Sequence, residues 1–204
     1  NPWIHIPAGI VALAEHRRLN WRFMTVPQEG AAGRAIRVPR GRVLGGSSSI
    51  NGMVYVRGHA SDYDDWAQAG NGGWSYAEVL PYFRKSENNE RLGDSPYHGK
   101  GGPLNVSDLE RRNPLVEVML EATDSLQLGR TDDFNGPNQE GFGPRQVTIR
   151  NGRRESTAMA FLAPARGREN LNVVTDGLVK RIVISEGRAR GVELVAGSRI
   201  IEAR

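Results

Sequence analysis

The sequence predicts a mixed α/β protein in which helices and strands follow one another along 204 residues. In the middle of the chain, serines followed by acids and by helically spaced apolar residues predict capped helices. Near the end, alternating apolar and polar runs separated by Asp176-Gly177 and Glu186-Gly187 predict a β-meander. The third feature is a glycine- and serine-rich stretch, residues 39–58, which is enclosed by apolar residues.

Composition argues against several classes of protein. The chain has no cysteine, so it offers neither disulfides nor thiol chemistry. Its net charge of +4 comes from arginines dispersed among acids, without a basic helix or zinc-finger spacing, and we expect no nucleic-acid partner. No apolar run is long enough to cross a bilayer, so no transmembrane segment is predicted. The chain opens on Asn1 instead of Met, from which we expect a fragment of a longer protein.

The start of the chain predicts a short helix, a strand and a turn. Residues 1–15 hold small apolar residues after Pro7, which favour a loop that enters a short helix. Residues 20–27 alternate apolar and polar side chains as a strand does. Residues 28–35 are rich in glycine, which is typical of a turn.

The glycine- and serine-rich stretch is suited to a large ligand with anionic oxygens. Gly45, Gly46 and Gly52 allow close approach and positive φ, and the hydroxyl and N–H groups of residues 47–49 form a concavity for anions. A helix that begins near residues 49–51 would add a favourable dipole. A flexible linker is the alternative, but this stretch is short and continues into the alternating sequence INGMVYV.

Other well-known motifs are missing from the sequence. No Gly-Lys-Ser/Thr follows the glycines, which argues against a P-loop, and GxGxxG does not occur. The absence of GxSxG argues against a serine hydrolase.

Two capped helices are predicted next. Ser61 predicts the N-cap of a helix that ends at Gly70, and the acids at positions 62, 64 and 65 fit the first turn of this helix better than a metal site. Ser75 and Glu78 form the capping-box pattern of a second helix that runs through Lys85.

The middle of the chain predicts loops around one further helix. We expect a polar loop over residues 88–102 and a short strand over 103–106. Asn113-Pro114 predicts the start of a helix that ends before Gly129 and has one apolar face toward the core. That face consists of Leu115, Val118, Met119 and Ala122. Residues 131–143 predict a long loop that borders a cleft.

The last third predicts mostly strands. Residues 143–149 favour a strand, and residues 156–162 favour a short helix that Pro164 ends. Alternating runs at 171–175, 178–185 and 188–195, followed by 199–202, complete the meander.

A family resemblance rests on motifs that occur in order along nearly the whole chain. Residues 39–58, PRGRVLGGSSSINGMVYVRG, followed by DYDDW at 62–66 and GWSY at 73–76, resemble the first signature of the glucose-methanol-choline (GMC) flavoprotein oxidoreductases. The similarity continues through TDDFNG at 131–136 and RESTA at 154–158. It is strongest to the choline dehydrogenase and alcohol dehydrogenase branch.

The resemblance implies a fold and a domain organisation. It implies part of an FAD-binding Rossmann-like domain with the β-meander, and part of an antiparallel-sheet substrate domain. The implied segments are 1–17 in the FAD domain, 18–44 as a lid over FAD, 45–74 as an extended FAD-binding segment, 75–155 in the substrate domain, and 156–204 in the FAD domain with the meander.

The resemblance also implies which residues contact the cofactor. The implied FAD-contacting residues are Val43, Ser47, Asn51, Gly52, Met53, Val54 and Val179. Ile50 stands where some family members have a histidine bonded covalently to the flavin, so FAD is expected to bind here without a covalent link. Val179 alone is also explained as an ordinary strand residue.

The resemblance places the catalytic residues outside this chain. The catalytic histidine and its partner are expected beyond Arg204, and the family's GxGxxG unit before Asn1. None of the four histidines, at positions 5, 16, 59 and 98, is nominated as the base. The span by itself is therefore expected to be inactive.

The implied function is FAD-dependent oxidation of a primary alcohol, choline or a related compound, to the aldehyde by hydride transfer to flavin N5. The alternatives are an FAD-containing hydroxynitrile lyase of the same family and a non-catalytic module without flavin. A small alcohol is the expected partner, the electron acceptor is open, and a cytoplasmic or membrane-associated location is expected.

Overall fold

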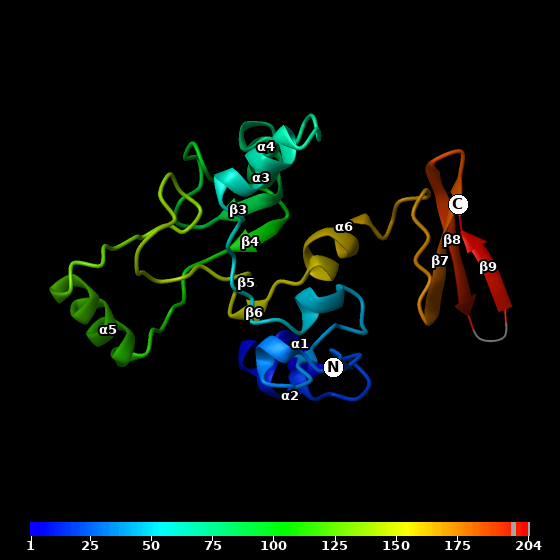
Figure 1. The fold of residues 1–204 in the computed structure, drawn as a ribbon, viewed down its shortest axis with the longest axis horizontal. Coiled ribbons are helices and arrows are strands. Elements are labelled where there is room, and N and C mark those ends of the chain that lie inside the picture. Colours follow the sequence, from blue (N-terminus) through cyan, green and yellow to red (C-terminus); the bar gives the residue numbers. More distant parts are fainter. Residues whose placement is uncertain (197–198, 204) are drawn as a thin grey trace. The chain divides into compact units, whose positions relative to one another are not determined.

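A computed structural model describes residues 1–196 and 199–203 of the chain (Figure 1). The chain divides into two units, Asn1–Pro164 and Ala165–Arg204. Residues 156–164 lie in the first unit, apart from the meander. The assignment of residues 156–204 to one segment of the FAD domain stays a prediction.

Three short helices open the first unit, where the sequence predicts a loop that enters one short helix. They are α1 (Pro2–His5), the 3₁₀-helix η1 (Pro7–Gly9) and α2 (Ile10–Ala14). The Asn1 side chain caps α1 by accepting a hydrogen bond from the Trp3 N–H. Leu13 in α2 is fully buried and anchors this end of the unit.

A small hairpin follows. Strand β1 (Phe23–Met24) pairs antiparallel with β2 (Arg37–Val38), and the turn between them includes η2 (Glu29–Ala31). The predicted turn over 28–35 is confirmed, but the predicted strand is reduced to two residues. Arg22 has a φ of +57°, and Pro27 has no N–H to donate, so both ends of the predicted strand leave the ladder.

Two capped helices form the next layer of the first unit. Helix α3 (Ala60–Gln68) is capped by His59, whose Nδ1 faces the Ser61 N–H at 3.3 Å, and not by Ser61 as predicted. The Asp62 carboxylate accepts from the His59 N–H at 2.7 Å and completes a capping box. Helix α4 (Tyr76–Ser86) has the predicted Ser75 and Glu78 box.

The predicted polar loop over 88–102 is wrong at its start. Residues Glu87–Asn89 form β3, which pairs in parallel with β4 (Leu104–Val106). Glu87 and Asn89 are fully buried, because their side chains are bonded inside the protein instead of to water. The ladder here is parallel, where an antiparallel sheet was expected.

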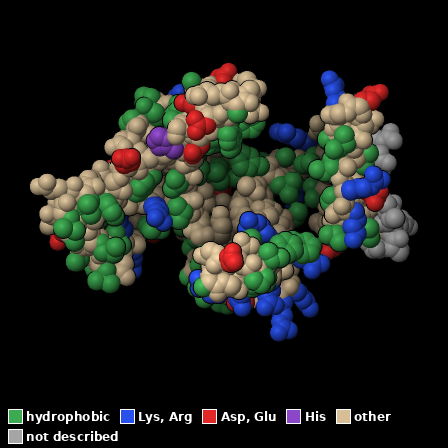
Figure 2. Space-filling model, viewed as in Figure 1, with side chains coloured by type: hydrophobic (Ala, Val, Ile, Leu, Met, Phe, Trp, Pro, Cys, Tyr) green, Lys and Arg blue, Asp and Glu red, His purple; other side chains and the backbone are tan. Residues whose placement is uncertain are grey.

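Helix α5 (Pro114–Ser125) begins at the predicted Asn113 cap, but its predicted core face is wrong. Leu115 and Met119 are each 67% exposed, and only Leu120 of this helix is buried. Figure 2 shows hydrophobic side chains gathered on the surface of this helix. Helical spacing identifies an apolar face, but it does not show whether another element covers that face.

The last residues of the first unit pair with segments from its middle. Strands β5 (Ile149–Arg150) and β6 (Arg153–Arg154) form an antiparallel hairpin, so the predicted strand over 143–149 is regular only at its end. Val147 still bridges to Val54 and Ser107. The predicted helix is present as a π-helical turn, Ala158–Leu162, and continues through α6 (Ala163–Ala165), so Pro164 does not end it.

The second unit is the predicted meander. Strands β7 (Gly177–Ser185), β8 (Arg188–Ala196) and β9 (Arg199–Ala203) pair antiparallel in that order. Glu186 and Gly187 have φ values of +52° and +71°, as tight hairpin turns require. Residues 171–175 form no strand, because alternation does not create a strand without a neighbour to pair with.

Candidate functional site

The candidate site is the segment 43–54, called the Gly-Ser bend below. The 3₁₀-helix η3 (Gly46–Ser49) lies at its centre, preceded by Gly45 at a φ of +86°. A Cβ on Gly45 would lie 2.6 Å from Ser49 Oγ and 3.1 Å from Ala158 Cβ. Glycine is therefore required there for both conformation and space. The predicted helix start near residues 49–51 is wrong, because the short helix comes earlier and ends at buried Ile50.

The three serine hydroxyls differ in their bonding. Ser48 Oγ donates to the Gly45 carbonyl at 2.5 Å, and Ser49 Oγ donates to the Leu44 carbonyl at 2.8 Å. Ser47 Oγ accepts from the Gly41 N–H at 3.2 Å, which leaves its own proton available. The expected concavity of three hydroxyls is therefore reduced to one free donor, on exposed Ser47.

The second half of the bend exposes backbone donors. The Met53 N–H donates to Asn51 Oδ1 at 3.1 Å and holds Met53 at a φ of +62°, a conformation that few side chains adopt. The N–H groups of Gly52 and Val54 have no hydrogen-bond partner among residues 1–196 and 199–203. Gly52 is exposed and does not need positive φ, whereas the Met53 side chain is buried.

Arg154 of β6 lies beneath the bend. Its Nη1 donates to the Asn51 carbonyl at 2.6 Å, to Asn51 Oδ1 at 2.9 Å and to the Ser48 carbonyl at 3.3 Å. Its Nε donates to the Ile4 carbonyl at 2.9 Å, and its Nη2 is buried without a partner. Burial lowers the pKa of this guanidinium. Sequence reasoning gave Arg154 no role beyond its place in the RESTA motif.

A second polar group, the His98 cluster, comprises Arg57, Glu87, Asn89, His98, Asp133 and Gln146. His98 Nδ1 lies 2.9 Å from Glu87 Oε1, and its Nε2 lies 2.9 Å from Asp133 Oδ2. Arg57 donates to Glu87 Oε2 at 2.7 Å. The Asn89 amide donates to Gln146 Oε1 at 2.7 Å. The cluster joins the segments around β3, residues 97–99 and residues 131–135 into one core.

The charges in this cluster stabilise one another. Burial alone would lower the pKa of His98, but hydrogen bonds to Asp133 and Glu87 raise it to about 9. Burial would likewise raise the pKa of Glu87 and of Asp133, yet their hydrogen bonds to His98 lower both. His98 is thus charged, fully buried and bonded through both ring nitrogens. It cannot take up a further proton, so the cluster is structural.

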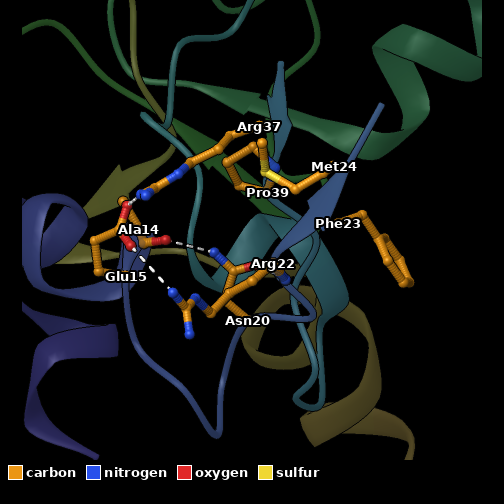
Figure 3. A pocket seen from close by; sticks show the side chains of 8 residues that line it. All are labelled: Ala14, Glu15, Asn20, Arg22, Phe23, Met24, Arg37 and Pro39. Carbon is orange, nitrogen blue, oxygen red and sulfur yellow. Dashed lines mark hydrogen bonds and ion pairs between the residues drawn. The ribbon is translucent and has the colours of Figure 1, made fainter. Parts of the chain in front are cut away.

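A pocket of about 170 Å³ lies between α2 and the β1–β2 hairpin. Figure 3 shows the side chains that line it. Glu15 forms ion pairs there with Arg37 and, at 3.8 Å, with Arg22. Asn20 donates to the Ala14 carbonyl at 2.7 Å. The only acid among the described residues of the lining, Glu15, is engaged by both arginines, so the pocket leaves no free acid or base for chemistry.

A larger pocket of about 280 Å³ is lined in part by Glu90, Asp108 and Glu110. Asp108 is paired with Arg91 at 2.7 Å. Within the described part of the chain, no group of histidines and acids is arranged to hold a metal ion. No helix of that part is both long and apolar enough to cross a membrane.

The structure brings together six of the seven predicted cofactor residues. Val43, Ser47, Asn51, Gly52, Met53 and Val54 all lie in the Gly-Ser bend. Val179 lies in the second unit, on β7, where it is 52% exposed and adjoins a shift in the strand register. Contact of these seven residues with FAD stays a prediction.

Comparison with known proteins gives a consistent result. The model of the GMC oxidoreductase family matches residues 8–204. The chain is 48% identical over 196 residues to the oxygen-dependent choline dehydrogenase of Brucella anthropi, covering 96% of this chain and 35% of that protein. The chain thus spans about a third of the length of the curated relatives that it matches.

Solved structures show the same fold. A pyridoxine 4-oxidase from Mesorbium loti superposes with a TM-score of 0.90 at 38% identity, over 99% of this chain and 40% of the other. An FAD-dependent oxidoreductase from Chaetomium thermophilum gives a TM-score of 0.83 at 26% identity, over 100% of this chain and 37% of the other. The motif order, the mixed fold and the family match lead to one conclusion: the chain belongs to the GMC oxidoreductase family.

Proposed function

We propose that the Gly-Ser bend binds FAD and that the protein carrying it oxidises a primary alcohol to the aldehyde. The observation that carries this proposal is a set of donors without protein partners on one exposed stretch of the described residues. These donors are the Ser47 hydroxyl, the Asn51 amide and the N–H groups of Gly52 and Val54. FAD offers matching acceptors, namely phosphate oxygens and the carbonyl and ring nitrogen atoms of the isoalloxazine.

The chemical roles divide between cofactor and protein. When bound, FAD would supply the hydride acceptor. The bend would bind and orient FAD, because its residues 43–54 include no acid, base or histidine. A group outside the bend must take the hydroxyl proton, and His98 is unsuited to this because both of its ring nitrogens are engaged. Val43, Met53 and Val179 are included among the FAD contacts on the strength of the family similarity.

Choline is the first substrate to test. The 48% identical relative is named for choline, and the structural neighbour at 38% identity is named for pyridoxine, which is also a primary alcohol. The test mixes the full-length protein with choline under anaerobic conditions and follows the flavin absorbance. Bleaching is expected. Trimethylglycine, which has no hydroxyl, is the matched control and should leave the spectrum unchanged.

Each other outcome of this experiment has a clear meaning. A flavin spectrum that no primary alcohol bleaches would contradict alcohol oxidation and favour a non-redox reaction such as cyanohydrin cleavage. A protein purified without flavin would contradict the cofactor assignment itself. Oxygen consumption during turnover would identify the electron acceptor.

The bound FAD is proposed to carry no covalent link at Ile50. Its side chain is a hydrocarbon, 5% exposed, and has no nucleophilic atom. Acid precipitation of the full-length protein should release the yellow chromophore into the supernatant. Flavin that stays on the pellet would refute this.

A further inference from the structure

Arg154 is a buried cation without a balancing acid. It is 2% exposed, and all its hydrogen-bond acceptors are neutral oxygens of Ile4, Ser48 and Asn51. No carboxylate lies within ion-pairing distance among residues 1–196 and 199–203, and Glu155, the next residue, is paired with Arg150 at 2.9 Å. A buried charge is normally paired, because removal from water is costly. An uncompensated arginine beneath a proposed cofactor site therefore needs an explanation.

The same arginine fixes the orientation of the Asn51 side chain. Asn51 Oδ1 accepts from Arg154 Nη1 at 2.9 Å and from the Met53 N–H at 3.1 Å. Both partners can only donate, so the oxygen of the carboxamide must face them. The Nδ2 group, which has no partner among the described residues, is left as a donor on an exposed residue. A flipped amide would place two donors against Arg154 and lose both hydrogen bonds.

We infer that Arg154 is a positioning residue for the flavin site, which locks Asn51 as a hydrogen-bond donor to FAD and leaves one positive charge beneath the bend. This inference rests on the proposed binding of FAD to the Gly-Ser bend. A role limited to binding backbone carbonyls would explain the contacts to Ile4 and Ser48. It would not explain why no acid accompanies the guanidinium, whereas the other buried arginine, Arg57, is paired with Glu87 at 2.7 Å.

The expected consequence is electrostatic. A two-electron reduction adds negative charge to the flavin, and a nearby cation in a poorly solvated setting favours the reduced form. Loss of this charge should therefore lower the midpoint potential of the bound flavin. Loss of the Asn51 donor should weaken FAD binding, because a hydrogen bond from the protein to the cofactor disappears.

The sharpest test is Asn51→Asp in the full-length holoprotein. Aspartate keeps the oxygen that accepts from Arg154 and Met53, so the bend retains its internal contacts and gains an ion pair. It also replaces the outward donor by an acceptor and cancels the buried charge. We expect the dissociation constant of FAD to rise about tenfold or more. We expect the reduced-to-oxidised ratio of the bound flavin, at a fixed potential, to fall about tenfold, which is about 30 mV for a two-electron couple.

Three further variants separate charge from fold. Arg154→Met removes the charge and should lower the potential as Asn51→Asp does, whereas Arg154→Lys keeps the charge and should restore most of the wild-type potential. Arg153→Met is the matched control, because Arg153 is the neighbouring residue of β6 but is exposed. It removes the same charge and should leave the potential and the dissociation constant of FAD unchanged.

The outcomes distinguish this inference from the proposed function. Wild-type protein that binds no FAD would contradict the proposed function, and the inference would fall with it. Wild-type protein that binds FAD, together with an Asn51→Asp variant of unchanged potential and unchanged FAD affinity, would overturn the inference alone. If Arg154→Met does not fold, Asn51→Asp and Arg154→Lys still decide the question.

Discussion

The first unit buries two arginines and treats their charges in opposite ways. Arg57 donates to Glu87 at 2.7 Å, inside a cluster in which His98 and Asp133 also balance each other. Arg154 is also buried but has only neutral partners. In the first arrangement, called closed below, every charged side chain is paired with an opposite charge within the protein. The second arrangement leaves one positive charge unpaired and several hydrogen-bond donors without a partner among the described residues. This is expected where a ligand completes the site.

This difference shows how hydrogen bonding distinguishes structural from functional polar groups within one core. The His98 cluster holds the more strongly shifted pKa values, yet its charges are paired with one another and both ring nitrogens of His98 are engaged. The Gly-Ser bend has no titratable side chain but has free donors on an exposed surface. Exposed hydrogen-bond donors without a protein partner are therefore a better guide to the ligand site here than shifted pKa values.

The largest effect on stability is expected from breaking the closed arrangement. Glu87→Gln keeps the shape of the side chain but leaves Arg57 and His98 without their shared counter-charge. Removing one member of a buried ion pair should lower the free energy of unfolding by about 3–5 kcal/mol. Urea denaturation of the full-length protein measures this. The control is Glu193→Gln, which breaks a surface pair with Arg181 at 2.9 Å and should cost less than about 1 kcal/mol. Equal losses would show that the cluster is not the stabilising core.

A strong pH dependence should come from the same cluster. The pKa of His98 rises from 6.5 to about 9 on folding, so its contribution is fully present below pH 6.5 and is lost as the pH rises through 9. The loss should reach about 3 kcal/mol. The pKa values of Glu87 and Asp133 are lowered, so their contribution is lost in acid instead. Urea midpoints measured from about pH 6 to about pH 10 test this, because that range includes the pKa of His98 in the unfolded and in the folded state. A flat profile would contradict a charged His98.

A smaller effect is expected from the Gly-Ser bend itself. Gly45→Ala forces a side chain into a φ of +86° and places its Cβ 2.6 Å from Ser49 Oγ. The backbone conformation alone should cost about 1–2 kcal/mol. Thermal unfolding of the variant measures the loss. A variant as stable as the wild type would show that the bend adopts another conformation.

The smallest loss of stability is expected at an exposed helix cap, and it serves as a reference for the losses at the buried sites. Ser75→Ala removes an exposed capping box at the start of α4 and should cost about 1 kcal/mol. Helix content by circular dichroism and the urea midpoint report it. A loss as large as that of Glu87→Gln would mean that exposed caps and not buried charges dominate the stability of this unit.

Local chemistry explains what the sequence could predict. The Ser75 and Glu78 box needs only residues three apart, and the meander needs only alternation and its Glu186-Gly187 turn. The positive φ of Gly45 and Gly46 follows from the absence of a side chain. Each of these features is decided within a few residues, so the pattern is sufficient.

Contacts between distant residues explain what the sequence missed. His98 meets Asp133 across 35 residues, and Arg154 meets Asn51 across 103. No periodicity encodes such pairs, and a polar strand such as β3 looks like a loop until its partners are known. The prediction that the apolar face of α5 packs into the core was wrong for a related reason, because the exposure of that face depends on what lies outside the helix.

The central claim is that the open face of the Gly-Ser bend receives FAD, and one titration tests it most directly. Gly46 has a φ of +55°, and a Cβ built there meets nothing within 4 Å. Gly101 has a φ of +82° and the same open surroundings, so Gly46→Leu and Gly101→Leu carry similar backbone strain. FAD titrated into the two full-length apoproteins should bind to Gly101→Leu as to the wild type and at least about tenfold more weakly to Gly46→Leu, the loss of roughly one good contact. Equal binding by both variants would contradict the account.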